Sequence, residues 1–167
     1  VSKNAKKILI TMGGSDPKKI TLKVLSSINK LNKNYEIVVI IGKASNIKNQ
    51  DIDNVMSKYK GNYKVLRNVD DMAKLMLNCD IAFTNSGLTK YELSALGIPS
   101  IIISNTEQHA MYSDYFSRYE SSIHLGSMDA VTIKDIEECC YNLMRDYKLR
   151  FKMSTNGKSL VGCDGLQ

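Results

Sequence analysis

Short apolar runs alternate along the chain with stretches in which apolar residues recur at helical spacing. The runs are three to six residues long, as expected for strands buried on both faces of a parallel sheet. They lie at residues 7–12, 36–41, 63–66, 81–83, 99–104 and, more weakly, 122–125. Helices are predicted at residues 20–31, 46–59, 72–76, 88–96, from about 105, at 132–145 and at 147–160, with a turn at 162–165. This alternation predicts one three-layer α/β domain over residues 1–167, with a parallel sheet of five or six strands.

Three of the predicted strands run directly into polar turns. Gly13-Gly14-Ser15-Asp16-Pro17 follows the first strand, Asn85-Ser86-Gly87 follows the fourth, and residues 105–109 follow the fifth. Ligands of parallel sheets bind outside the carboxyl ends of the strands, where the backbone N–H groups of helix starts favour anions. Ser15 or Asp16 is suited to cap the following helix. The Gly-Gly turn is neither a G-x-G-x-x-G motif nor a P-loop. It indicates a ligand site mainly because it lies at the same end of the sheet as the other turns.

Glu92 stands out in the helix that follows the fourth strand. On a helical wheel it lies among Leu88, Tyr91, Ala95 and Leu96, which would place a carboxylate within an apolar face. Such a carboxylate needs hydrogen-bond donors, and the two adjacent hydroxyls of a ribose would supply them. The alternative is a side chain that extends to the surface or caps a neighbouring loop, which is the commoner arrangement for a lone Glu.

Composition narrows the choice of partners. The net charge is +6, but 19 of the 23 cations are lysines and they are scattered. We therefore predict no nucleic-acid partner, since such proteins usually carry a basic stripe or arginine forks. No apolar run approaches the roughly 18 residues of a membrane span and no signal peptide is visible, so we expect a cytoplasmic protein with four reduced cysteines. The cysteines form no C-x-x-C pair, and we predict neither a metal site nor a cofactor.

Several segments together resemble the C-terminal domain of GT-B-type nucleotide-sugar enzymes. The resemblance covers nearly the whole chain. It is strongest to the UDP-sugar hydrolase of the pseudaminic acid pathway and to spore-coat polysaccharide proteins, and weaker to the lipid-linked N-acetylglucosaminyltransferase of peptidoglycan synthesis. It implies a Rossmann-like domain, the C-terminal half of a GT-B fold. The matching segments are Gly13–Pro17, Asp71-Met72-Ala73 with Asp80, Ser86–Glu92, Gly97-Ile98-Pro99 and Glu107-Gln108.

This resemblance also implies a role for each matching residue. Residues near the diphosphate would be Gly13, Gly14, Ser15, Ser86, Gly87, Leu88 and Thr89, with two helix N-termini stabilising its charge. Asn68 and Val69, within residues 67–69, would contact the uracil largely through backbone groups. Glu92 would bind the ribose hydroxyls, and Glu107 and Gln108 would face the sugar. No catalytic residue is assigned. His109 is a weak candidate base, because a histidine at a helix start is more often a polar surface residue.

Three functions follow from the resemblance. The first is a UDP-sugar hydrolase of bacterial surface-glycan synthesis that releases UDP. The second is a glycosyltransferase of the same fold, and the single glycine of the Asn85-Ser86-Gly87 turn is closer to that pattern. The third is a non-catalytic nucleotide-sugar-binding module fused to a sugar-nucleotide synthetase. In the two enzymes the cleft would lie against an N-terminal domain of the same full-length protein, which this chain lacks. We therefore expect the chain alone to bind UDP or a UDP-sugar without turnover.

Overall fold

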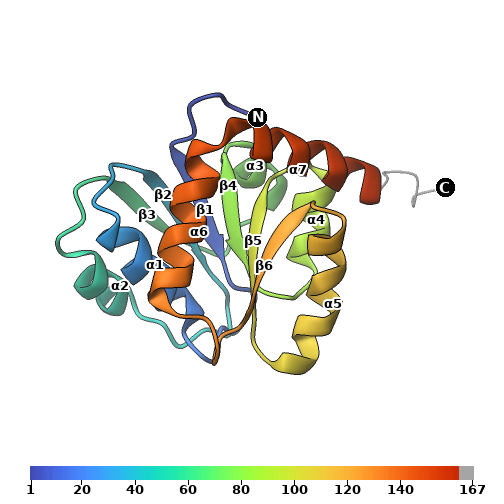
Figure 1. The fold of residues 1–167 in the computed structure, drawn as a ribbon. Helices are drawn as coiled ribbons and strands as arrows, with labels where there is room; N and C mark the ends of the chain where they lie inside the picture. The colour runs from blue at the N-terminus through green and yellow to red at the C-terminus, as the bar shows by residue number, and fades with distance from the viewer. Residues whose placement is uncertain (162–167) are drawn as a thin grey trace.

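Six parallel strands form one sheet at the centre of the molecule (Figure 1). The computed structural model describes residues 1–161. The strand order is β3-β2-β1-β4-β5-β6, and all neighbouring pairs are parallel. The predicted fold class is therefore confirmed. The strands are β1 (Lys7–Thr11), β2 (Glu36–Ile41), β3 (Asn62–Arg67), β4 (Ile81–Thr84), β5 (Ser100–Ser104) and β6 (Ser122–Ser127).

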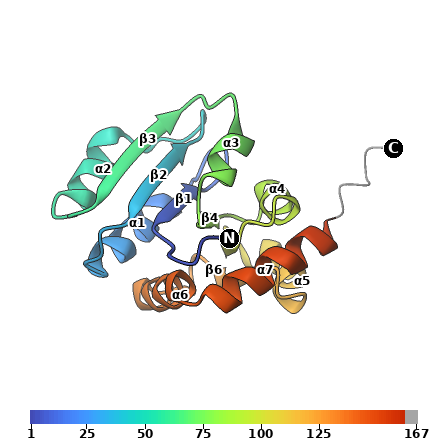
Figure 2. The same cartoon turned by 90° about the horizontal axis from the view of Figure 1, so that it is seen from above.

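Helices cover the sheet on both faces (Figure 2). One face carries α1 (Ile20–Lys30), α2 (Asn49–Met56) and α6 (Ile133–Arg145). The other carries α3 (Met72–Leu77), α4 (Thr89–Ala95) and α5 (Glu107–Arg118). The last helix, α7 (Tyr147–Leu160), packs against α6 and α4. The helix at residues 46–59 is shorter than predicted, because Ile47 lies before α2 and packs into the core.

Strand side chains are buried on both faces, which explains the continuous apolar runs. The larger core lies under α1, α2 and α6, and the smaller one under α3 and α4. The smaller core contains Leu9, Ile40, Met76, Ala82, Leu93 and Ile98. All residues of β4 and β5 are buried, whereas β3 at the sheet edge is half exposed.

Arg150 is a wholly buried cation that the sequence analysis did not single out. Its guanidinium donates to the carbonyl oxygens of Leu143 and Met144, both at 2.7 Å. It also donates to those of Ser2 and Lys3, at 3.0 and 3.2 Å. Desolvation lowers the pKa of this guanidinium from its ordinary value. Arg150 thus joins the segment before β1 to the junction of α6 and α7.

Three of the four cysteines lie in the described part of the chain, and all three are free thiols. Burial raises the pKa of Cys79 and of Cys139 to about 12 and also raises that of Cys140, so these thiols are poor nucleophiles. Cys163 and the turn predicted at 162–165 lie outside the described residues. None of the helices within residues 1–161 has the length and apolarity that crossing a membrane requires.

Candidate functional site

The strand order places the turn after β1 beside the turn after β4. β1 pairs directly with β4, with Thr11 opposite Thr84, so the turns that follow these two strands leave the same edge of the sheet. The chain order also reverses here, since β2 and β3 extend to one side of β1 and β5 and β6 to the other side of β4. Such a switch point is where open α/β sheets bind ligands. Two of the predicted anion-binding turns therefore meet at the expected place.

Asn85 ties these two turns together. Its amide nitrogen donates to the carbonyl oxygen of Met12 at 2.9 Å, and its amide oxygen accepts from the backbone N–H of Gly87 at 2.9 Å. Gly13 lies against this side chain with φ at +78°, and a Cβ there would be 2.6 Å from the Asn85 amide nitrogen. Only glycine satisfies both conditions easily. Asn85 was not among the predicted site residues, although a strand-ending Asn was a visible signal.

A glycine at the end of β2 supports the first turn from the other side. A Cβ on Gly42 would lie 2.4 Å from the carbonyl oxygen of Gly13 and 2.3 Å from that of Gly14. Next to it, the N–H of Ala44 donates to the same Gly14 oxygen at 3.0 Å. By contrast, a Cβ on Gly14 would meet no atom within 4 Å, and Gly14 and Ser15 are both exposed. The turn is therefore held from behind and open in front.

Asp16 caps α1, as the sequence predicted. It is 95% buried, and its carboxylate accepts the N–H groups of Ile20 and Thr21 at 2.8 and 3.0 Å and the Thr21 hydroxyl at 2.6 Å. These two helix donors are thus occupied by Asp16, and a contribution of the α1 N-terminus to diphosphate binding stays a prediction. What remains at this turn is the exposed backbone of Gly14 and Ser15.

The predicted apolar face of α4 is wrong. Leu88 is 80% exposed and Tyr91 43% exposed, while the buried face carries Lys90, Leu93 and Ser94. Hydropathy misses this face because a lysine and a serine lie on it. Gly157 lets α7 approach this face closely, since a Cβ on Gly157 would be 2.9 Å from the Ser94 carbonyl oxygen.

Glu92 is exposed in the first turn of α4. It lies close in sequence to the exposed side chains of Leu88 and Tyr91 and not inside the core. The carboxylate is therefore accessible to a ligand from solvent, although it does not lie within an apolar face as predicted.

Lys90 is the residue of this region that sequence reasoning passed over. Its side chain is 97% buried, and its ammonium donates to the carbonyl oxygens of Ser86 and, at 3.2 Å, of Gly87. The nitrogen lies 4.8 Å from the ring centre of Tyr91 and 5.7 Å from that of Phe116. Desolvation lowers the pKa of Lys90 from its ordinary value.

The segment predicted to meet the base follows β3. Asn68 is exposed and has φ at +53°, and Val69 packs against the smaller core. The guanidinium of Arg67 donates to the carbonyl oxygen of Ile47 at 2.6 Å and to the Asn49 side chain at 3.2 Å. Arg67 therefore fixes this loop to the segment before α2. The loop lies at the carboxyl ends of the strands, like the turn after β1, and β2 lies between β1 and β3.

Glu107, Gln108 and His109 begin α5 at the end of β5 and are all exposed. Thr106 caps this helix by accepting the N–H of His109 at 3.3 Å. The carboxylate of Glu107 accepts the hydroxyl of Ser127 from the end of β6. These three residues therefore lie at the predicted edge, and Glu107 leans toward β6.

Ser104, His124 and the exposed Asp114 form a chain of contacts between residue types that hydrolases use. His124 contacts the hydroxyl of Ser104 through Nε2 at 2.9 Å and the carboxylate of Asp114 through Nδ1 at 2.7 Å. Ser104 is completely buried, so its hydroxyl cannot reach a substrate. These contacts instead join β5, β6 and the middle of α5.

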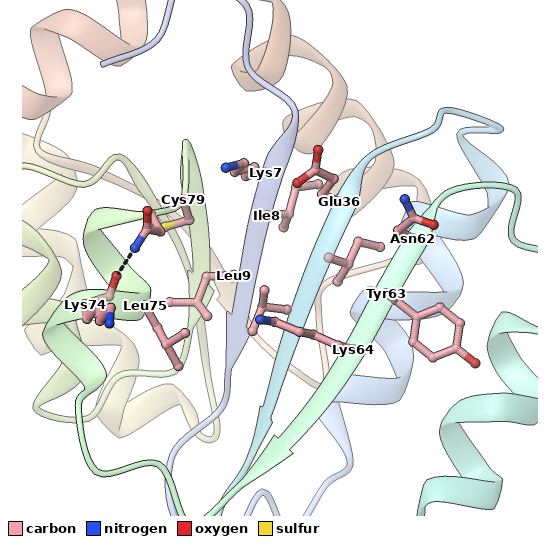
Figure 3. Close-up of a pocket in the computed structure, with 13 residues that line it drawn as sticks. Lys7, Ile8, Leu9, Glu36, Asn62, Tyr63, Lys64, Lys74, Leu75 and Cys79 are labelled. Carbon is pink, nitrogen blue, oxygen red and sulfur yellow. Dashed lines mark hydrogen bonds between the residues drawn. The ribbon is translucent and has the colours of Figure 1, made fainter.

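A separate hollow lies at the opposite end of the sheet. A cavity of about 510 Å³ lies over the other end of the sheet, where Lys7, Glu36 and Asn62 begin β1, β2 and β3 (Figure 3). Lys64 and Lys74 also line it. It is separate from every predicted site residue. Within residues 1–161, no group of three or more His, Cys, Asp and Glu side chains is placed to hold a metal ion.

The fold is a doubly wound α/β domain with a switch point between β1 and β4, and comparison with known proteins gives its family. Residues 8–157 match the glycosyltransferase family 28 C-terminal domain, and the chain belongs to this family. It is 27% identical over 168 residues to the spore coat polysaccharide biosynthesis protein SpsG of Bacillus subtilis, covering 99% of this chain. It spans only 49% of SpsG, or about half of that relative.

Solved structures support the same fold. MurG from Acinetobacter baumannii superposes with a TM-score of 0.76 at 15% identity, covering 95% of this chain and 46% of MurG. MnaA from S. aureus, solved with UDP, superposes with a TM-score of 0.70 at 16% identity, covering 90% of this chain and 40% of MnaA. The expected Rossmann-like half of a larger enzyme fold is thus found, while a specific relation to the pseudaminic acid hydrolase is not among these findings.

Proposed function

We propose that this chain is the UDP-sugar-binding domain of an enzyme that builds a surface glycan. The observation that carries the proposal is the pair of turns at the switch point, joined through Asn85 and open to solvent at Gly14 and Leu88. The family match, the likeness to SpsG and the UDP-bound neighbour support it. An N-terminal domain of the same protein would close the cleft, in keeping with the half-length coverage of SpsG.

In this proposal each accessible group meets one part of the nucleotide sugar. Backbone groups of Gly13, Gly14 and Ser15 and of the Ser86–Thr89 segment bind the diphosphate. Glu92 accepts both ribose hydroxyls, which suits an exposed carboxylate with two oxygens. Backbone groups of Asn68 and Val69 meet the uracil, and Glu107 and Gln108 meet the sugar. The charge that develops on the departing UDP is then stabilised by donors held in place before the reaction.

The reaction that fits this half-site is displacement of UDP from the sugar. The family and the Asn85-Ser86-Gly87 turn support transfer to a hydroxyl of a sugar or lipid acceptor. Hydrolysis, with water as the acceptor, is the second candidate, and the Gly13–Pro17 segment with its likeness to the UDP-sugar hydrolases supports it. Both reactions use the same leaving group, so the domain's task is the same.

The catalytic base is proposed to lie in the absent domain. Of the three local candidates, Asp16 is buried as a helix cap and Glu107 accepts a hydrogen bond from Ser127. His109 is exposed at the start of α5, with no described group orienting its ring. A general base must be held within hydrogen-bond reach of the proton that it removes, and we propose that the absent domain supplies this group.

Titration calorimetry tests this proposal. Residues 1–167 should bind UDP with a Kd of about 1 mM or tighter, a threshold that a half-site should reach. ADP serves as the control, because it has the same diphosphate and ribose with a different base. Binding of UDP that exceeds that of ADP supports the proposal, and absence of UDP binding by the folded domain contradicts it.

A further inference from the structure

Lys90 is an unusual residue to bury. Ammonium groups inside proteins are normally paired with a carboxylate, because removing a charge from water is costly. Among the ion pairs of residues 1–161, none involves Lys90. Its described partners are two backbone carbonyl oxygens and two aromatic rings, all of them uncharged. A positive charge is therefore stored directly behind the turn without a counter-charge.

Its hydrogen bonds also determine how the turn presents its backbone. The peptide bonds of the described chain are all trans, so each N–H points away from the carbonyl oxygen of the same peptide group. Lys90 draws the Gly87 carbonyl oxygen toward the interior, and the N–H of Leu88 in that peptide group consequently points outward. The neighbouring N–H of Gly87 is already taken by Asn85. Leu88 thus offers an outward donor whose direction depends on Lys90.

We propose that Lys90 is a positioning residue for the diphosphate of a nucleotide ligand. It holds the Ser86–Leu88 backbone in its anion-accepting orientation, and its positive charge behind the turn attracts the negative charge of the diphosphate. This inference rests on the proposed function and adds a residue to it. The lowered pKa of Lys90 agrees with an ammonium that lacks a charged partner in the ligand-free state. An anion on the other side of the turn would relieve that cost.

The competing explanation is that Lys90 only stabilises the fold of α4. The two explanations differ in which ligands they affect. A residue that acts on the diphosphate changes the affinity for UDP more than that for UMP, and leaves uridine nearly unchanged. A residue that only stabilises the turn changes all three alike, because each depends on the same intact domain.

The experiment compares Lys90→Met with the wild type, using uridine, UMP and UDP in calorimetric titrations. Methionine keeps most of the buried volume and removes the charge. Lys74→Met on α3, an exposed lysine away from the turn, is the matched control. We expect UDP to bind Lys90→Met at least about tenfold more weakly, with uridine affinity unchanged, a split in the range of charge-assisted hydrogen bonds. Equal losses for uridine and UDP, or no loss, overturn the inference.

A measurement on the wild-type domain covers the case in which Lys90→Met does not fold. In NMR spectra of the backbone amides and of the lysine side chains, the Leu88 N–H signal and the Lys90 side-chain signal should both shift on addition of UDP and not on addition of uridine. If UDP binds without moving either signal, Lys90 has no part in diphosphate binding, although the proposed function stands. If the wild type binds no UDP, the proposed function itself fails and this inference fails with it.

Discussion

The two ends of the sheet differ in structure: one carries a hollow, and the other carries turns whose backbone is held by specific contacts. At the amino ends of β1, β2 and β3 there is a large hollow, lined by side chains that begin strands and by exposed lysines. At the carboxyl ends of β1 and β4, contacts of Asn85, Gly42 and Lys90 fix the backbone of the turns. Ligand pockets are usually the largest concave sites. If the domain forms one side of a cleft, as proposed, a fixed and open backbone indicates the binding site better than a hollow does.

The largest expected effect concerns turnover. Residues 1–167 incubated with UDP-N-acetylglucosamine should release no UDP above the buffer control, because no described base is oriented toward the site and an open half-cleft leaves the bond in water. A coupled assay for free UDP measures this. Turnover of about 1 per second or more, at ordinary enzyme rates, that disappears in His109→Ala would make His109 the base and refute the half-site account.

Removing the ribose contact should be the next largest effect. Glu92→Ala should weaken UDP binding by about 1.5–3 kcal/mol, the range for hydrogen bonds to a charged group. Calorimetry on both proteins measures the difference. Glu137→Ala on α6, an equally simple change on the far face of the sheet, should leave binding unchanged. Equal UDP affinity in Glu92→Ala and the wild type would remove Glu92 from the site.

Support of the first turn gives a prediction about stability. Gly42→Ala should cost about 1–3 kcal/mol of unfolding free energy, because its Cβ would press on two carbonyl oxygens and the packed turn cannot yield freely. Gly14→Ala is the matched control and should change stability little, since its Cβ meets no atom within 4 Å. Urea unfolding of the two variants measures the contrast, and similar costs would show that the turn is not held from behind.

The smallest effect is expected at the hollow. Lys64→Ala removes a lysine that lines the cavity at the amino ends of the strands, and UDP affinity should change by less than about 0.5 kcal/mol, as for surface changes away from a site. Calorimetry again gives the answer. A loss as large as that in Glu92→Ala would move the binding site to the opposite end of the sheet.

The sequence predicted the fold because the signal for it is local. Strands buried on both faces appear as apolar runs, and their alternation with helices restricts the topology to a parallel sheet. The expected position of the site follows from the same topology, because ligands of such sheets bind outside the carboxyl ends of the strands. Asp16 was also predictable as a cap, since an Asp ahead of a helix is a short-range pattern.

What the sequence did not reveal depends on contacts between distant segments. Asn85 reaches Met12 across 73 positions, and Gly42 matters only because the Gly13-Gly14 turn lies against it. The face of α4 was misjudged for the same reason. Its buried face carries Lys90 and Ser94 beside Leu93, and α7 packs against this helix. Periodicity cannot predict such contacts, because each depends on which elements the fold brings together.

Backbone amide NMR of residues 1–167 titrated with UDP tests the central claim most directly. The account predicts shifts at residues 13–15, 68–69, 86–92 and 107–108, all at the carboxyl edge of the sheet. Lys7, Asn62 and Lys74 around the hollow should stay unchanged. Shifts concentrated around the hollow, with the turns after β1 and β4 unaffected, would contradict it.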